Sequence, residues 1–253
     1  MIIQPRLVEF VGLPGAGKTT IAQRVIQELT DSGHRCFGLS RLDTPEGLQK
    51  EAGGFYDKLR SAGYCALSCI VHRKIAKDAL LYGVHVEPFN IISLRRVFRF
   101  MVRLKSVTKL ANGSYDMVIL DQGIMQDIWS IAASGHPPSD DTYLERLINS
   151  ILDRLSLLVV VIDIDVEKAI QRIARRQTMR SRFDRMPVNQ AEALLNRHKD
   201  VFTQIVKVVR RCKRAECLSV SGDLPVDQNV EAIASFLERG SRKWALQGRS
   251  LNE

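Results

Sequence analysis

Residues 7–20 read LVEFVGLPGAGKTT, an apolar run followed by a glycine-rich turn, a lysine and two threonines. Residues 12–19 fit the pattern of glycine, any four residues, glycine, lysine and serine or threonine, which is the Walker A phosphate-binding loop. Glycines let consecutive backbone N–H groups turn toward one anion, and a helix expected over residues 21–29 points its N-terminal dipole at the same place. The sequence therefore predicts a nucleoside triphosphate site on a strand, loop and helix.

The residues of this loop have separate predicted roles. We expect Lys18 to reach the β- and γ-phosphates of a nucleotide and the Thr19 hydroxyl to hold Mg²⁺. The expected cofactors are therefore ATP and Mg²⁺. The predicted nucleotide-binding residues of the loop are Gly12, Leu13, Pro14, Gly15, Ala16, Gly17, Lys18, Thr19 and Thr20.

Length and composition are typical of a soluble globular chain. The 253 residues are 45% hydrophobic and 26% charged, enough to bury a full core. No stretch approaches the roughly 20 apolar residues that span a bilayer, and residues 1–5 lead directly into the first predicted strand. These features favour a cytoplasmic protein. The five cysteines lack the spacing of a metal site, so we expect reduced, mostly buried thiols.

The charge balance favours an anionic ligand. Lys and Arg outnumber Asp and Glu by 37 to 28, which gives a net charge of +9. Such a charge suits an anionic substrate, and it also fits nucleic acid or an acidic surface. The sequence is compatible with a monomer or a homodimer.

Strand-like apolar runs alternate with helical segments along the chain. Several of these runs are apolar without alternation, as expected for strands covered on both faces. Alternation of such strands with helices is typical of a parallel α/β sheet with right-handed crossovers. The predicted strands are residues 6–11, 35–40, 117–120, 157–162 and 217–220.

The connection over residues 45–114 is too long for a simple crossover, and we expect a helical insertion that carries three helices. The third places Leu94, Val97, Phe98, Met101 and Leu104 on one stripe, with basic residues on an adjoining face. That basic face has three interpretations: a solvated flank of a core helix, a surface for nucleic acid or a membrane, or arginines that line an acceptor pocket. Its residues are Arg95, Arg96, Arg99, Arg103, Lys105 and Lys109.

A second basic cluster, with Arg175, Arg176 and Arg182, follows the fourth strand, in a segment of about residues 174–187. Phosphoryl transfer spreads negative charge over the γ-phosphate oxygens, and cationic side chains that close over them stabilise the transition state. A mobile lid would occupy this position, although a run of charges is also typical of a solvated surface. We expect one domain over residues 1–239, a last helix over residues 226–237 and a loose tail over residues 240–253.

Polar residues follow the second and third predicted strands. Asp121 comes directly after the run at 117–120, and a carboxylate there is well placed for Mg²⁺ or an acceptor, or for capping the following helix. In the loop after the second strand, Arg41 would hold an acceptor phosphate and Asp43 would accept a proton from an attacking hydroxyl. A polar turn ended by Pro45 explains the same residues.

The order of these parts resembles the nucleoside and nucleotide kinase group of P-loop proteins, and within it the thymidylate kinase-like branch. The resemblance rests on the phosphate loop, the loop at 40–45, the strand that ends in Asp121, and the segments 161–172, 181–184 and 220–230. It implies an α/β P-loop NTPase fold with a five-stranded parallel sheet in the order 2-3-1-4-5, a helical insertion and an Arg-rich lid. It also implies that Arg175, Arg176 and Arg182 serve the lid and that residues 220–230 carry the adenine-side loop.

The acceptor side departs from that family. Thymidylate kinases usually follow the third-strand Asp with Arg, whereas Gln122 and Gly123 follow Asp121 here, and Thr44 stands where their loop has an acid. We therefore name Arg41, Asp43 and Gln122 as substrate-binding candidates without naming the acceptor. The favoured function is an ATP-dependent phosphotransferase acting on a nucleoside, a nucleotide or a similar small anion. The alternatives are a nucleotide-binding regulator or degenerate kinase without turnover, and a nucleic-acid end kinase.

Overall fold

The computed structural model describes residues 6–39, 63, 65–86, 91–132, 140–175, 183, 186–212 and 214–250. Within these ranges, side chains are described as far as Arg239, apart from those of Arg6, Leu39 and His198.

Five parallel strands form the single described sheet, in the order β2-β3-β1-β4-β5. This order confirms the predicted fold class. β1 lies at the centre, and its Leu7 pairs with Val118 of β3 and with Leu157 of β4. The strands are β1 (Arg6–Gly12), β2 (Cys36–Leu39), β3 (Met117–Leu120), β4 (Leu157–Asp163) and β5 (Ala215–Ser221).

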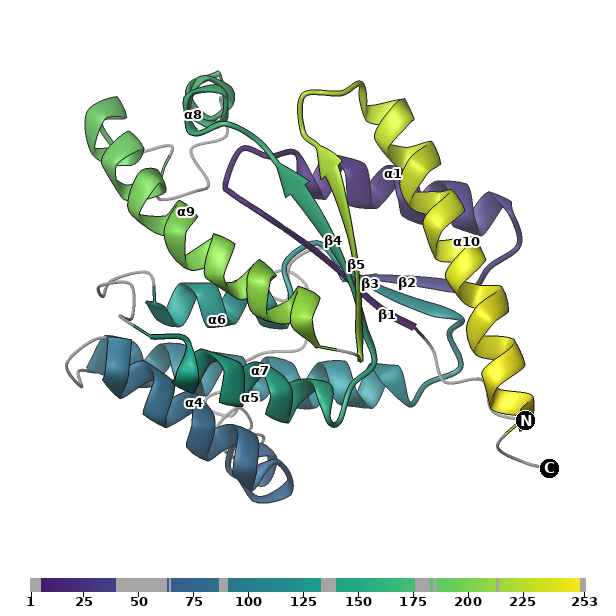
Figure 1. The fold of residues 1–253 in the computed structure, drawn as a ribbon, viewed down its shortest axis with the longest axis horizontal. Coiled ribbons are helices and arrows are strands. Elements are labelled where there is room, and N and C mark those ends of the chain that lie inside the picture. Colours follow the sequence, from purple (N-terminus) through teal and green to yellow (C-terminus); the bar gives the residue numbers. More distant parts are fainter. Residues whose placement is uncertain are drawn as a thin grey trace, which may run out of the picture.

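Helices cover both faces of the sheet (Figure 1). One face packs against α1 (Lys18–Asp31), α8 (Val166–Ala174) and α10 (Val226–Ser250). The other packs against α4 (Arg73–Val86), α5 (Ile91–Ala111), α6 (Ile124–Ala132) and α7 (Thr142–Leu152). Each face of the sheet thus has its own hydrophobic core, the first on the α1 side and the second on the α5 side. α9 (Val188–Arg211) contributes its first turns to the first core and its later turns to the second core. The result is a three-layer α/β/α arrangement, as expected for strands that are apolar on both faces.

The central strand has one polar residue in the core. Val8 and Phe10 point to the α1 side, whereas Leu7 and Val11 point to the side of α5 and α6. Glu9 shares the second face by alternation, and it is fully buried. A carboxyl group at the centre of a sheet is costly without partners, so its surroundings need an explanation.

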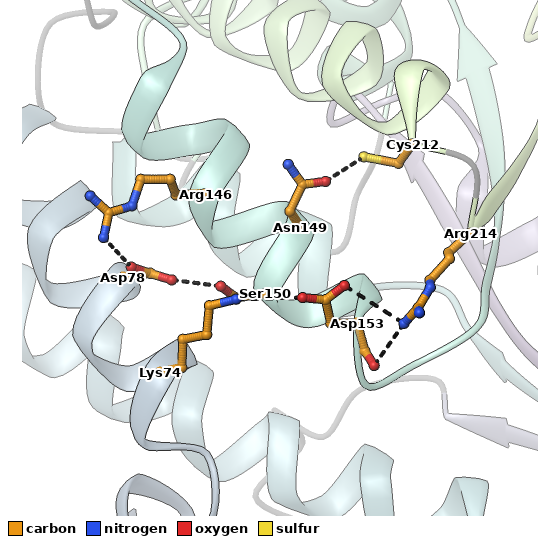
Figure 2. A network of polar contacts seen from close by, with 8 residues as sticks. All are labelled: Lys74, Asp78, Arg146, Asn149, Ser150, Asp153, Cys212 and Arg214. Carbon is orange, nitrogen blue, oxygen red and sulfur yellow. Dashed lines mark hydrogen bonds and ion pairs between the residues drawn. The ribbon is translucent and has the colours of Figure 1, made fainter.

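A separate polar network joins the helices on the outer side of the second core (Figure 2). The buried Asp78 of α4 accepts hydrogen bonds from the Ser150 hydroxyl of α7 at 2.6 Å and from Arg146 at 3.3 Å. Asp153, just after α7, binds Arg214 in front of β5. These contacts hold α4 to α7 and α7 to the start of β5, so they stabilise the helical layer.

The last helix and the third helix of the insertion differ from the sequence expectations. The last helix continues to Ser250, so the part of the expected tail as far as that residue is helical, because Gly240 costs a helix only about 1 kcal/mol. Leu94 and Phe98 of the expected apolar stripe are exposed, whereas Arg103 is buried.

In the described part of the chain, no helix has the length and apolar character needed to cross a membrane.

Candidate active site

The phosphate loop has the backbone shape that its glycines predict. Gly15 and Gly17 both have φ of +91°, a conformation that side chains other than glycine rarely adopt. A Cβ on Gly15 would lie 2.6 Å from the carbonyl oxygen of Ala169, and one on Gly12 would lie 2.6 Å from that of Ile162. The loop therefore packs directly against α8 and β4.

The first amides of α1 are open to an anion. Gly17 is the N-cap residue and has no side chain to bond them, so the helix begins with donors that need partners from outside. Lys18 is mostly buried, and its Nζ donates to the carbonyl oxygens of Gly12 at 2.7 Å and Leu13 at 3.0 Å. The backbone amides at the start of α1 and the ammonium group of Lys18 therefore lie at the same loop.

The end of β3 meets the start of α1. The Thr19 hydroxyl donates to Oδ2 of Asp121 at 2.9 Å, although the two residues are 102 positions apart. Asp121 is 2% exposed, and its Oδ1 is buried without a hydrogen-bond partner among the described residues. The structure therefore brings together the two predicted metal-binding residues and leaves a buried carboxylate oxygen to be satisfied.

The oxygen ligands of Thr19 and Asp121 suit Mg²⁺, which is usually bound through one or two carboxylates, waters and substrate phosphates.

Asp121 does not cap α6, the alternative role predicted for it. The amide of Gln126, near the start of α6, instead donates to Oε1 of Glu9 at 3.1 Å. The described residues contain no group of three or more His, Cys, Asp or Glu that could hold a metal ion by itself.

A pocket of about 270 Å³ opens beside the phosphate loop. Arg172 of α8 donates to the carbonyl oxygen of Gly222, the first residue after β5, at 2.8 Å. Nearby, Lys168 binds Asp223 at 2.6 Å, so two contacts join α8 to the segment between β5 and α10. The pocket is lined by Gly15, Ala16, Gly17, Thr20, Ile21, Arg172, Gly222, Leu224 and Val226.

Behind Asp121 lies a buried cluster of charges. Arg103 of α5 donates from one guanidinium nitrogen to the carbonyl oxygens of Gln122 at 3.1 Å and Gly123 at 3.3 Å. Its Nε lies 3.2 Å from Oδ2 of Asp127 on α6, and both side chains are 4% exposed. Glu9 packs against the same turn, because a Cβ on Gly123 would lie 2.5 Å from the Glu9 Cδ.

Burial raises the pKa of Glu9 from 4.5 to about 7. The backbone amides of Met125 and Gln126 lower this pKa, the charge of Asp127 raises it, and the charge of Arg103 lowers it. Desolvation is the dominant effect because it disfavours the ionised form of a fully buried carboxyl. Glu9 therefore changes charge near neutral pH.

The remaining predicted site residues are spread more widely. Gln122 is exposed, and its carbonyl oxygen rather than its side chain has the contact with Arg103. Arg175 is exposed at the C-terminal end of α8. Arg41, Asp43, Arg176 and Arg182 lie outside the described residues, so their roles stay predictions.

Sequence reasoning missed the charged cluster. It placed Arg103 on the basic face of the helix without a buried ionic partner, but this residue is buried on α5 near Phe100, Leu104 and Val107, which are buried too. The available signal was Glu9, a charged residue inside an otherwise apolar strand, which needs a buried partner.

The five cysteines were predicted as reduced, mostly buried thiols. They are free and only partly buried.

Comparison with known proteins supports the fold. No family model matches the sequence, and no curated protein does. Among solved structures, the chain is similar to that of deoxyadenosine kinase from M. mycoides with bound dATP, with a TM-score of 0.51 and 17% sequence identity. The similarity covers 92% of this chain and 99% of that one. The protein therefore shares the P-loop kinase fold over most of its length.

Proposed function

We propose that this protein is an ATP-dependent, Mg²⁺-requiring phosphotransferase that acts on a nucleoside, a nucleotide or a similar small anionic acceptor. The observation that carries the proposal is the 2.9 Å contact between the Thr19 hydroxyl and the Asp121 carboxylate at the mouth of the phosphate loop. In P-loop enzymes the loop hydroxyl and a strand-end carboxylate hold the metal of the nucleotide.

The donor half of the site follows from the backbone. The phosphates bind to the amides at the start of α1, and Lys18 neutralises the β- and γ-phosphates. The nucleoside extends into the pocket beside the loop, where the Arg172 guanidinium and Leu224 provide a flat cationic face and an apolar wall. A base stacks well between such groups.

The catalytic power comes from charge placed in advance. When bound, Mg²⁺ neutralises the negative charge that develops between the β- and γ-phosphates. Thr19 and Asp121 would hold it, because Asp121 offers the buried Oδ1 that has no hydrogen-bond partner among the described residues. Arg175, Arg176 and Arg182 would approach the transferring group from the lid, as their place after α8 suggests.

The acceptor is proposed by chemical class. Arg41 and Asp43 would bind it and accept its proton, and Gln122 lies exposed at the same edge as Asp121. The structural neighbour is named for deoxyadenosine, and this similarity extends over nearly the whole chain. Deoxynucleosides are therefore the first acceptors to test.

The test is an acceptor screen that couples ADP release to a panel of nucleosides and nucleotides, with mass spectrometry of the product. We expect phosphorylation of at least one member. Lys18→Met should lower the rate of phosphoryl transfer by a factor on the order of 1,000, because the negative charge of the transition state is no longer stabilised by the lysine ammonium group. Asp121→Asn should lower the rate comparably. Gln27→Met, an exposed change on α1, is the matched control.

Two results would overturn the proposal. One is ATP binding without a phosphorylated product across the panel, which would favour the regulator without turnover. The other is a Lys18→Met protein as active as the wild type, since no mechanism based on this loop survives that outcome.

A further inference from the structure

The turn that carries Asp121 is held from behind by α5, the helix on which the sequence predicts a basic face. Leu120 is the last β3 residue paired in the sheet, opposite Glu9 and Leu39. Asp121 is therefore the first residue beyond the ladder, and strand pairing does not fix its carboxylate. Other contacts must define the direction in which it points.

Arg103 supplies those contacts. Its Nη1 binds the two consecutive carbonyl oxygens of Gln122 and Gly123 at 3.1 and 3.3 Å. Its Nε faces Asp127, whose other carboxylate oxygen lies 3.5 Å from Nε of Arg99. A planar guanidinium binds in several directions at once, so it fixes the turn relative to both α5 and α6.

Glu9 closes the opposite side of the turn. Its carboxyl group fills the space that a side chain at position 123 would occupy, and it accepts the hydrogen bond from Gln126 at the start of α6. Removal of the Arg103 guanidinium would leave two turn carbonyls without this donor, at least one of them buried. Buried carbonyls of that kind are costly, so the turn would shift and move Asp121 with it.

We propose that Arg103 is a positioning residue for the metal site, which holds the 121–123 turn so that Asp121 faces Thr19 and bound Mg²⁺. The proposal rests on the proposed function, because it concerns the metal of the nucleotide. It assigns a role in phosphoryl transfer to a residue whose guanidinium binds the 121–123 turn and Asp127. It also explains why an arginine is buried in the middle of α5.

The test measures ATP affinity by calorimetry with saturating Mg²⁺ and with EDTA, in the wild type and in Arg103→Lys. Lysine keeps the charge beside Asp127 but lacks the planar fork, so the protein should still fold. Loss of a partner that orients a metal ligand typically weakens metal binding 10- to 100-fold. We expect the gain in ATP affinity from Mg²⁺ to fall about tenfold in Arg103→Lys, and the affinity in EDTA to change less than twofold.

Asp121→Asn provides the benchmark. If Arg103 acts through Asp121, the double variant should lose no more of the Mg²⁺ gain than Asp121→Asn alone, because coupled residues are non-additive. Arg211→Lys is the matched control. It makes the same change on α9, where Arg211 binds the carboxylate of Glu145 at the surface.

Gly123→Ala is a second, independent variant, in case Arg103→Lys does not fold. Its Cβ would lie 2.5 Å from Glu9 and 2.8 Å from Leu120, so the turn must move, and the Mg²⁺ gain should again fall about tenfold. An undiminished Mg²⁺ gain in both variants would overturn the positioning role, and so would equal losses with Mg²⁺ and with EDTA. If the wild type bound no ATP, the proposed function would fail first and this inference with it.

Discussion

Glu9→Gln should remove a pH dependence from the stability of the protein. The folded-state pKa of Glu9 is about 7, against an ordinary value of 4.5 for a glutamate carboxyl in water. Below pH 4.5 the carboxyl group is protonated in both folded and unfolded chains, and Glu9 costs no stability through ionisation. Between those values the unfolded chain ionises while the folded chain keeps its proton, so stability falls as the pH rises.

The size of the effect follows from the shift. Each pKa unit corresponds to about 1.4 kcal/mol, so the wild type should lose roughly 3 kcal/mol of unfolding free energy between pH 4.5 and pH 8. The glutamine side chain introduced by Glu9→Gln cannot ionise in either state. Its amide oxygen is still able to accept the hydrogen bond from Gln126 that Glu9 accepts at 3.1 Å.

The assay is urea unfolding at several pH values and constant ionic strength, with circular dichroism and fluorescence as probes. Other titrating groups contribute equally to both proteins, so the difference in unfolding free energy isolates Glu9. That difference should shift by roughly 3 kcal/mol in favour of the variant as the pH rises from 4.5 to 8. Glu28→Gln, on the exposed side of α1, removes no buried carboxyl and should show no such shift. Parallel pH profiles for wild type and Glu9→Gln would refute the reasoning.

Three further predictions concern the loop, the pocket and the helical layer. Gly15→Ala should lower ATP affinity at least tenfold in calorimetry, because its Cβ would meet the Ala169 carbonyl. Gly33→Ala, with φ of +88° but open space around it, should lose only about 1 kcal/mol of stability and keep its ATP affinity. Leu224→Ala should weaken ATP binding by about fivefold through lost apolar contact and leave inorganic tripolyphosphate binding unchanged; equal losses for both ligands would place the base elsewhere. Asp78→Ala should cost about 3 kcal/mol in urea unfolding, since a buried carboxylate and its partners are lost, whereas the more exposed Asp153→Ala should cost at most about 1 kcal/mol. Equal costs for the two would contradict the role given to the buried network in Figure 2.

The sheet was predictable because its strands are apolar on both faces and because the Walker A pattern identifies β1 and α1. The strands predicted at residues 117–120 and 157–162 closely match β3 (Met117–Leu120) and β4 (Leu157–Asp163). The strand order followed from the family resemblance rather than from the apolar runs, since periodicity does not reveal which strands are neighbours. The structure confirms that order.

The candidate site was predictable where a local motif combines with a general rule of parallel sheets. The proximity of Thr19 and Asp121 follows from the rule that parallel strands bring their carboxyl ends to one edge. The partnership of Glu9, Arg103 and Asp127 links three separate elements, and no local pattern encodes such a pairing. Arg103 was predicted as one residue of a basic face, and charged residues are seldom buried. Its buried carboxylate partner and the turn carbonyls offset the cost of desolvation.

The most direct test of the central claim is a crystal structure of the protein with Mg²⁺ and a non-hydrolysable ATP analogue. We predict that the phosphates bind to the amides of residues 15–19 and to Lys18. The metal should contact the Thr19 hydroxyl and have Asp121 as a direct or water-mediated partner, and the base should lie beside Arg172 and Leu224. A nucleotide bound away from this loop, or a metal held without Thr19 and Asp121, would contradict the account.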